Sequence, residues 1–278
     1  MKANVLSLEG KKVSEVQLPK QFSEPIDGSL IKRAVLAIQS ASKQLNYPTP
    51  LAGRDNTAEY YGNRHKPQRH RTINIGKARK PRLKNRRSVI SGNVASIPAT
   101  VGGPKAHPPK SNKIAEEKMN KKEKRKATAS AIAATAIAKL VKERGHKFDE
   151  KLIFPLIIES KIEELEKTSN VKKVFKDLGV WSDVERAISK RQIRAGKGKK
   201  RGRKYKRRKS ILIVADNTEK VFKASRNLEG VDIVSVTNVN ADLLAPGAVP
   251  GRLTLWSESA IKKLEEGKKI EAKIEAKA

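Results

Sequence analysis

The most constraining feature of this 278-residue sequence is a long segment, residues 46–111, with no helical or strand period that could bury one face. Eight of the thirteen prolines fall in it, together with fourteen lysines and arginines and only two acids, Asp55 and Glu59. A stretch of this length without secondary structure is unusual inside a compact domain and is either functional or disordered. Its composition favours an extended backbone held by a polyanion, and a disordered solubilising insertion is the alternative.

The positive charge is concentrated in two places. The formal net charge is +33, and residues 46–111 contribute +12 of it. Residues 196–209 contribute a further +10 with no acidic residue, whereas residues 210–278 are neutral in sum. Charge gathered in two extended segments is the footprint of a nucleic-acid-binding protein.

We expect the basic side chains of both segments to contact phosphates, because bound lysines and arginines release counterions from a nucleic-acid backbone. In the central segment the candidates are Arg54, Arg64, Lys66, Arg69, Arg71, Lys77, Arg79, Lys80, Arg82, Lys84, Arg86 and Arg87. In the second they are Arg191, Arg194, Lys197, Lys199, Lys200, Arg201, Arg203, Lys204, Lys206, Arg207 and Arg208. The candidates for stacking on unpaired bases are Tyr60, Tyr61, His65 and His70, and more weakly Tyr205.

The rest of the chain, residues 1–45 and 112–278, alternates apolar strands with helical patterns. This predicts one α/β domain of three layers, with a mainly parallel sheet flanked by helices. Strands are expected at residues 152–158, 211–215, 232–236 and 252–256, after a hairpin over 3–19. Helices are expected from Asp27 or Ser29 to 45, and at 112–144, 171–178, 182–190, 219–227, 241–244 and 258–266. Residues 46–111 then form an extended basic loop inserted between the first two long helices.

The second basic segment, residues 196–209, is placed between an expected helix and an expected strand. This position favours a basic surface loop over a nuclear-import patch or a flexible tail. The same region contains Gly196-Lys197-Gly198, but a phosphate-cradling loop follows a strand and opens a helix, whereas this one precedes a strand. We therefore do not expect nucleotide binding.

No set of residues predicts chemistry, a cofactor or a metal. The sequence has no cysteine, which excludes disulfides, thiolate metal ligands and a cysteine nucleophile. Metal or general-base roles for the histidines would need carboxylate or further histidine partners, and His65 and His70 lie among arginines with no acid nearby in sequence. Asp216 follows an expected strand, where α/β enzymes often place a catalytic group, but no partner can be identified. We expect Asp216 to cap the following helix, and Trp256 to lie in the core.

No run approaches the roughly 20 apolar residues that span a bilayer, and the N-terminal residues lack the apolar core of a signal peptide. An intracellular, cytoplasmic protein without membrane contact is therefore the expectation. The neutral C-terminal quarter is where we expect neighbouring proteins to bind. We expect the chain to act as a single copy rather than as a homo-oligomer.

Several motifs resemble the L4 family of large-subunit ribosomal proteins in its archaeal and eukaryotic form. They are Arg194–Lys199 with the basic run after it, Arg226–Val231, Leu243–Gly247 and Pro250–Ala260. Gly76–Arg82 and Gly102–Lys105 look like the family's loop and its glycine- and proline-rich return, although this loop is less rich in glycine. The resemblance covers essentially the whole chain. The long C-terminal tail of eukaryotic members is absent, which favours an archaeal protein.

The resemblance implies a structural, non-enzymatic protein of the large ribosomal subunit that binds its ribosomal RNA. It also implies that the extended loop reaches the wall of the peptide exit tunnel, with a tip near Lys77–Arg87 beside the nascent peptide. Two rival functions remain. A general DNA- or chromatin-binding protein would bind duplex DNA without preferring folded RNA, and an α/β enzyme acting on RNA would need an acid/base pair.

Overall fold

The computed structural model describes residues 2–60, 78–84 and 89–275, and in the last helix it describes side chains up to residue 266. The chain divides into two compact units, which are treated separately below. The first comprises Met1–Ala41 and Glu116–Ala278, and the second comprises Ser42–Ala115.

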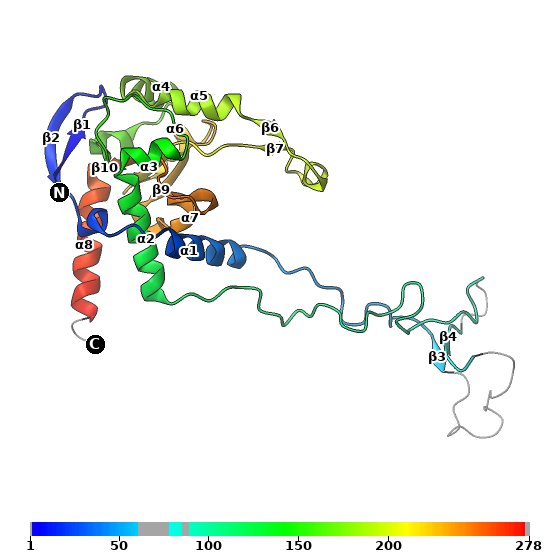
Figure 1. Ribbon diagram of the computed structural model, residues 1–278. Coiled ribbons are helices and arrows are strands. Elements are labelled where there is room, and N and C mark those ends of the chain that lie inside the picture. Colours follow the sequence, from blue (N-terminus) through cyan, green and yellow to red (C-terminus); the bar gives the residue numbers. More distant parts are fainter. Residues whose placement is uncertain (1, 61–77, 85–88, 276–278) are drawn as a thin grey trace. The chain divides into compact units, whose positions relative to one another are not determined.

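The first unit is built on a six-stranded sheet whose described strands run in the order β2-β1-β5-β10-β8-β9 (Figure 1). The hairpin β1 (Lys2–Leu6) and β2 (Lys12–Gln17) is antiparallel. All other neighbours pair in parallel, through β5 (Leu156–Ile158), β10 (Thr254–Ser257), β8 (Leu212–Ala215) and β9 (Asp232–Ser235). The predicted α/β fold with a mainly parallel sheet is confirmed.

Helices cover both faces of this sheet. On one face lie α1 (Gly28–Ala41), α2 (Lys121–Thr135), α7 (Ala241–Leu244), α8 (Glu258–Glu275) and the 3-10 turn η1 (Lys20–Ser23). On the other lie α3 (Ala138–Glu143), α4 (Thr168–Asp177), α5 (Trp181–Ser189), α6 (Glu219–Ser225) and the 3-10 turn η3 (Ser160–Glu164). The short 3-10 turns η5 (Val236–Asn238) and η6 (Pro246–Ala248) flank α7.

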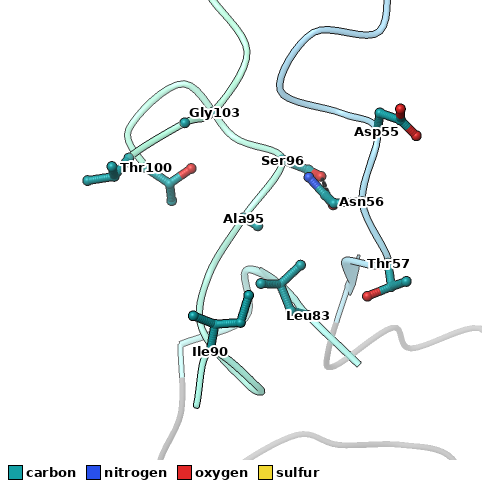
Figure 2. A pocket seen from close by; sticks show the side chains of 11 residues that line it. Asp55, Asn56, Thr57, Leu83, Ile90, Ala95, Ser96, Thr100 and Gly103 are labelled. Carbon is teal, nitrogen blue, oxygen red and sulfur yellow. Dashed lines mark hydrogen bonds between the residues drawn. The ribbon is translucent and has the colours of Figure 1, made fainter. Parts of the chain in front are cut away.

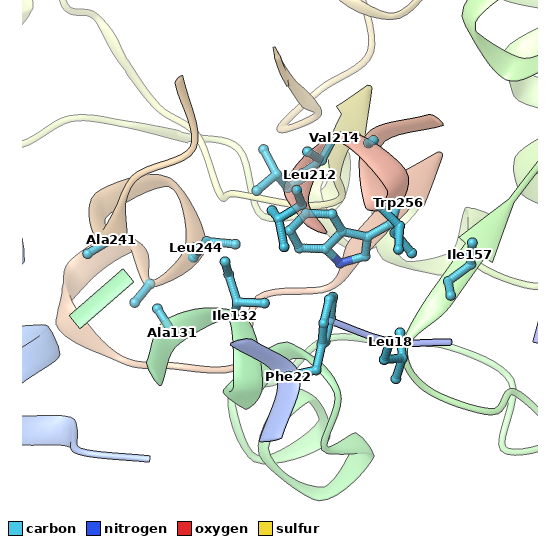
Figure 3. Packing of buried hydrophobic residues seen from close by; sticks show 14 of the residues in the cluster. Leu18, Phe22, Ala131, Ile132, Ile157, Leu212, Val214, Ala241, Leu244 and Trp256 are labelled. Carbon is cyan, nitrogen blue, oxygen red and sulfur yellow. The ribbon is translucent and has the colours of Figure 1, made fainter. Parts of the chain in front are cut away.

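The inner strands β5 and β8 are apolar throughout because each contributes to both cores. Leu212 and Val214 of β8 face the core under α1 and α2, whereas Ile213 and Ala215 face the other. Side chains alternate between the faces of a strand, so a strand covered on both sides loses its polar positions. Trp256 is fully buried, as predicted. The ring of Phe22 packs edge-on against it, with 5.4 Å between the two ring centres (Figure 3).

The prediction of a continuous helix over residues 112–144 is wrong at its start and in its middle. α2 begins at Lys121, because the residues before it are exposed and have no apolar face to bury against the sheet. The helix is interrupted after Thr135, whose hydroxyl donates to the carbonyl of Ile132 at 2.7 Å. Ile137 then takes an extended conformation before α3.

Two shorter expectations also change. The strand expected over residues 152–158 contains only Leu156–Ile158, because Pro155 has no amide to donate to a ladder. The prediction that Asp216 caps α6 is wrong. Asn217 accepts the amide of Glu219 at 3.2 Å, while the Asp216 carboxylate forms an ion pair with Lys263 of α8. Of the two caps expected for the first helix, Asp27 and Ser29, the structure has Asp27, whose Oδ1 accepts the amide of Leu30 at 3.1 Å. The helix ends at Ala41 rather than at residue 45.

Candidate nucleic-acid interface

The second unit, Ser42–Ala115, contains a short β-stem that the sequence did not predict. β3 (Glu59–Tyr60) pairs with β4 (Pro81–Arg82) in antiparallel register. A third pass of the chain joins them, because Arg82 forms a bridge with Val94 and the amide of Ala95 donates to the carbonyl of Pro81 at 3.0 Å. Two-residue strands carry no readable period, which explains why sequence patterns missed them.

Two predicted phosphate-binding residues are used inside this unit. The guanidinium of Arg82 donates to the carbonyls of Gly92 at 3.0 Å and Ala78 at 3.2 Å. Lys84 forms an ion pair with Glu59. Arg82 therefore holds the stem together, and Lys84 offsets one of the unit's two acids.

Other predicted residues of this unit are free to face a ligand. Arg54, Arg79 and Lys80 are exposed and form no ion pair with the residues that the structure describes, and the ring of Tyr60 is 65% exposed. The rest of this set lies outside the described residues: Tyr61, Arg64, His65, Lys66, Arg69, His70, Arg71, Lys77, Arg86 and Arg87.

Two segments of this unit, an outgoing pass that includes residues 53–57 and a returning pass that includes residues 90–104, enclose a pocket of about 390 Å³ (Figure 2). Asn56 and Ser96 face each other across it, and the Ser96 hydroxyl donates to the Asn56 side-chain oxygen at 2.6 Å. Leu83 and Ile90 line its apolar side. Close by, an added Cβ at Gly53 would be 2.3 Å from the nitrogen of Pro104, and one at Gly103 would be 2.0 Å from the carbonyl oxygen of Ile97. The two passes thus meet backbone to backbone at Gly53, whereas Gly103 packs on the backbone of Ile97 within the returning pass.

Replacing Gly103 by alanine is expected to open the turn between Ile97 and Gly103. The new methyl group cannot be accommodated by a flexible side chain, since the nearest atom belongs to the backbone of Ile97. Overpacking of this kind costs about 1–3 kcal/mol. Amide hydrogen exchange at Thr100 and Gly103 is expected to accelerate by roughly 10-fold or more, following that free energy. Gly28→Ala is the control, because nothing lies within 4 Å of its added methyl group. Equal exchange in both variants would contradict the close approach.

The second basic segment is a hairpin rather than the expected loop. β6 (Gln192–Ile193) pairs with β7 (Tyr205–Lys206), and the amide of Arg194 donates to the carbonyl of Lys204 at 2.8 Å. The turn is the 3-10 helix η4 (Lys197–Arg201), bounded by Gly196 at φ +81° and Gly202 at φ +76°. Figure 1 shows the two strands side by side, leading out to this turn.

Most cations of the hairpin point to solvent. Eight of the predicted residues are exposed and form no ion pair with a described residue: Lys197, Lys199, Lys200, Arg201, Arg203, Lys204, Lys206 and Arg208. Arg194 donates from Nε to the carbonyl of Arg203 at 3.2 Å. Arg191 and Arg207 instead pair with Glu229, at 3.2 and 3.5 Å. The Arg191 guanidinium also lies 4.0 Å from the ring centre of Tyr205, so that ring supports the hairpin on at least one face.

The hairpin is anchored at its base by a buried polar cluster that the sequence did not reveal. Asp183 of α5 is fully buried and accepts hydrogen bonds from Ser210 at 2.7 Å and from Arg186 at 2.8 Å. His146 Nδ1 lies 2.9 Å from the same carboxylate. Arg186 also donates to the carbonyl of Lys209 at 3.0 Å, which fixes the point where the hairpin returns to β8.

The charge states of this cluster follow from burial and pairing. Burial alone would raise the pKa of Asp183, but hydrogen bonds from His146 and Arg186 hold it well below its ordinary range. Burial lowers the pKa of His146 despite the neighbouring carboxylate. Although Ser210, His146 and Asp183 are the residue types of a hydrolase triad, Ser210 donates to Asp183 and not to His146. The His146 Nε2 is buried without a partner among the described residues, so no nucleophile is activated.

A second buried anchor is Arg252, which precedes β10. Its guanidinium is fully buried and donates to the carbonyls of Ser210 at 2.9 Å and Leu243 at 2.9 Å. It also donates to the carbonyl of Gly230 at 3.3 Å and pairs with Asp232 at 2.6 Å. Lys209 contacts the same Asp232 carboxylate at 2.7 Å, which ties the end of the hairpin to the first residue of β9.

The carboxyl edge of the parallel strands, where α/β proteins usually bind ligands, is occupied by a side chain. Glu163 of η3 accepts the amides of Asp216 and Asn217, both at 3.0 Å, and the hydroxyl of Ser257 at 2.7 Å. Burial would raise the pKa of Glu163, but hydrogen bonds from Ser259 and Ser257 lower it overall. This carboxylate therefore joins η3 to the ends of β8 and β10.

No catalytic or metal-binding arrangement is evident in the part of the chain that the structure describes. Within residues 2–60, 78–84 and 89–275, no three His, Asp or Glu side chains gather as they would around a metal ion. Among the described helices, none has the length and hydrophobicity needed to cross a bilayer. What the structure does present is a cationic hairpin held rigidly at its base and a second unit with exposed cations, an arrangement suited to a polyanion.

Comparison with known proteins agrees with this class. Residues 16–267 match the model of the ribosomal protein L4/L1 family, and the chain belongs to that family. It is 46% identical over 267 residues to the large ribosomal subunit protein uL4 of Archaeoglobus fulgidus, covering 96% of this chain and 99% of that protein. The protein of the same name from Methanocaldococcus jannaschii is 47% identical with the same coverage. That from Saccharolobus solfataricus is 44% identical, covering 95% of this chain and 94% of that protein.

Proposed function

We propose that this chain is a structural constituent of the large ribosomal subunit in the cytoplasmic ribosome and binds its ribosomal RNA through its two basic segments. The observation that carries the proposal is the hairpin of residues 192–206, whose exposed cations form no ion pair with the described residues. Relatives nearly as long as this chain are named as large-subunit proteins, which supports the same assignment.

Residues 1–45 and 112–278 act as one globular domain, and residues 46–111 act as an extended loop that enters the RNA. Phosphate contacts position such a loop, and the fold of the RNA rather than a base sequence selects it. Its tip, near Lys77–Arg87, lies at the wall of the peptide exit tunnel beside the nascent peptide. The basic hairpin is a second anchor on the same RNA. The chain works as one copy per subunit, next to other ribosomal proteins.

The two rival functions receive less support. An RNA-acting enzyme would need an acid/base pair near a cleft. The Asp183 carboxylate is instead occupied by hydrogen bonds from His146 and Ser210, and that of Glu163 by backbone amides and the Ser257 hydroxyl. A general DNA-binding protein would need no preference for folded RNA. The relatives' names favour the ribosome over chromatin.

The test is the salt dependence of binding to a transcript of the large-subunit RNA. Replacing Lys197, Lys199, Lys200 and Arg201 by glutamine removes four exposed charges from the tip of the hairpin. The log–log slope of affinity against salt is expected to decrease by about 3, because each of the four lost phosphate contacts contributes roughly 0.7–0.9. The matched control replaces four exposed lysines of the same unit, Lys151, Lys167, Lys173 and Lys176.

The control variant is expected to keep the wild-type slope. The proposal fails if both variants lose the same slope, since net charge alone would then account for binding. It also fails if duplex DNA displaces the labelled transcript from the protein as effectively as unlabelled transcript does. For the loop, hydrogen exchange over residues 46–111 is expected to be slower in purified large subunits than in the free protein.

A further inference from the structure

A groove on the first unit is cationic at one end and apolar at the other. It has a volume of about 690 Å³ and lies between α2, α8 and the chain around η5. Lys121 and Lys124 line its cationic end, whereas Ile132, Val239 and Leu264 line the apolar part. Pockets of about 300–1,000 Å³ accommodate organic ligands or the side chains of a docked peptide.

One face of α2 produces this change from a cationic end to an apolar end. Lys121, Lys124, Thr128 and Ile132 follow one another at spacings of three and four residues, so they form a single stripe along the helix. The first two are exposed, and Ile132 is only 3% exposed. A protein that binds through this face must therefore offer negative charge near the start of α2 and apolar groups near its end.

Lys121 and Lys124 place positive charge at the start of α2. Lys121 and Lys124 make no ion pair with the residues that the structure describes, whereas Lys263 at the groove is paired with Asp216. Cations in the first turn of a helix also oppose its macrodipole, so a bound carboxylate would relieve an unfavourable local field. Glu266 is the acidic residue among the described ones that line the groove.

A polar group at the groove also needs a partner. Gln21 of η1 lines the groove, is only 8% exposed, and its Oε1 has no hydrogen-bond partner among the described residues. A buried oxygen without a hydrogen bond lowers the stability of the fold by about 1–3 kcal/mol. A hydrogen-bond donor on a bound partner recovers this free energy once the carboxamide rotates toward it. Peptides supply such donors from amide N–H groups and serine or threonine hydroxyls.

We propose that this groove receives an acidic amphipathic helix of a neighbouring protein in the ribosomal subunit. Its carboxylates meet Lys121 and Lys124, and its apolar side chains pack on Ile132, Val239 and Leu264. A nucleic acid could neutralise the cations, but it has no apolar side chains for the other end of the groove. This inference rests on the proposed function, because the partner protein is expected in the large ribosomal subunit.

The experiment measures binding of a fluorescent helical peptide to the full-length protein at low salt. The probe carries leucines at positions i, i+3, i+4 and i+7 and glutamates along the flank of that stripe. Lys121→Glu with Lys124→Glu is expected to weaken binding by about 10-fold or more, since like charges then meet across the interface. Val239→Ser is expected to weaken it by roughly 5-fold, through lost apolar contact.

The matched control, Lys122→Glu with Lys126→Glu, makes the same charge change on a different side of α2 and is expected to leave peptide affinity within about 2-fold of wild type. Equal loss in the two charge-reversed proteins, or no binding by the wild type, overturns the proposal.

The same variants are titrated with the large-subunit RNA transcript, and unchanged RNA affinity is expected. If reversal at Lys121 and Lys124 weakens RNA as much as peptide while Val239→Ser changes nothing, the groove is a nucleic-acid surface and the proposal is wrong. If the hairpin variant at residues 197–201 binds RNA undiminished while the peptide results hold, the proposed RNA function fails and the groove inference stands.

Discussion

Arg252→Leu is expected to lower the free energy of unfolding by about 3–5 kcal/mol, the range measured when one partner of a buried ion pair is removed. Arg252 is fully buried, and leucine fills part of its volume but donates no hydrogen bonds. The carbonyls of Ser210, Leu243 and Gly230 then lose a charged donor. Each buried acceptor left without a partner adds to the loss.

The measurement is chemical denaturation at neutral pH, with Arg226→Leu as the control. Arg226 is exposed and donates no side-chain hydrogen bond to a described residue, so its replacement should change stability by no more than about 0.5 kcal/mol. A loss below about 1 kcal/mol at Arg252 would show that water satisfies the three carbonyls, contrary to the contacts described above.

Asp183→Asn is expected to cost about 2–4 kcal/mol at pH 7, because the Arg186 side chain, only 10% exposed, then lacks its counter-charge. Asparagine keeps the size of the side chain but removes the negative charge that holds His146, Arg186 and Ser210 together. The contact of Arg186 with the carbonyl of Lys209 depends on the same geometry, so hydrogen exchange at the base of the hairpin should also accelerate.

The pH dependence gives this prediction a definite sign. The pKa of Asp183 is lower in the folded protein than in the unfolded chain, so its contribution to stability is present above the unfolded pKa of about 3.9. That contribution is lost as the pH falls through the folded pKa. The stability difference between wild type and Asp183→Asn should therefore be full at pH 6–7 and shrink below about pH 4.

Asp177→Asn serves as the control for this series, since Asp177 is exposed at the end of α4. Its effect should be small at every pH. A difference between wild type and Asp183→Asn that grows on acidification would contradict the assignment of Asp183 as an ionised, buried anchor.

Much of the fold was predictable because it follows from local patterns. The apolar runs that became β8 and β10, the spacing of Ile31 and Val35 in α1, and the cap at Asp27 each record burial or a backbone hydrogen bond within a few residues. The predictions were wrong where a contact with a distant residue, or a single residue, determines the local structure. Pro155 shortens β5, and the helix expected from residue 112 starts only where it can pack.

The candidate interface was predictable in composition but not in form. The sequence identified the basic residues of 196–209, yet only the structure shows which of them remain free. Arg191 and Arg207 are paired with Glu229, a residue on a different part of the chain. Likewise, Arg82 appeared to be a phosphate ligand, and its hydrogen bonds to Gly92 and Ala78 make it a support of the β-stem.

The sequence by itself determined the fold class and the concentration of positive charge in two segments, because both depend on residue type and short-range order. The tertiary structure decided the roles of Asp183, Arg252 and Glu163. Most of their partners lie between 20 and 96 residues away along the chain, for example Asp232 for Arg252 and Ser259 for Glu163. Hydrogen bonds between such distant residues leave no periodic trace, so only folding brings the groups together and sets their charge.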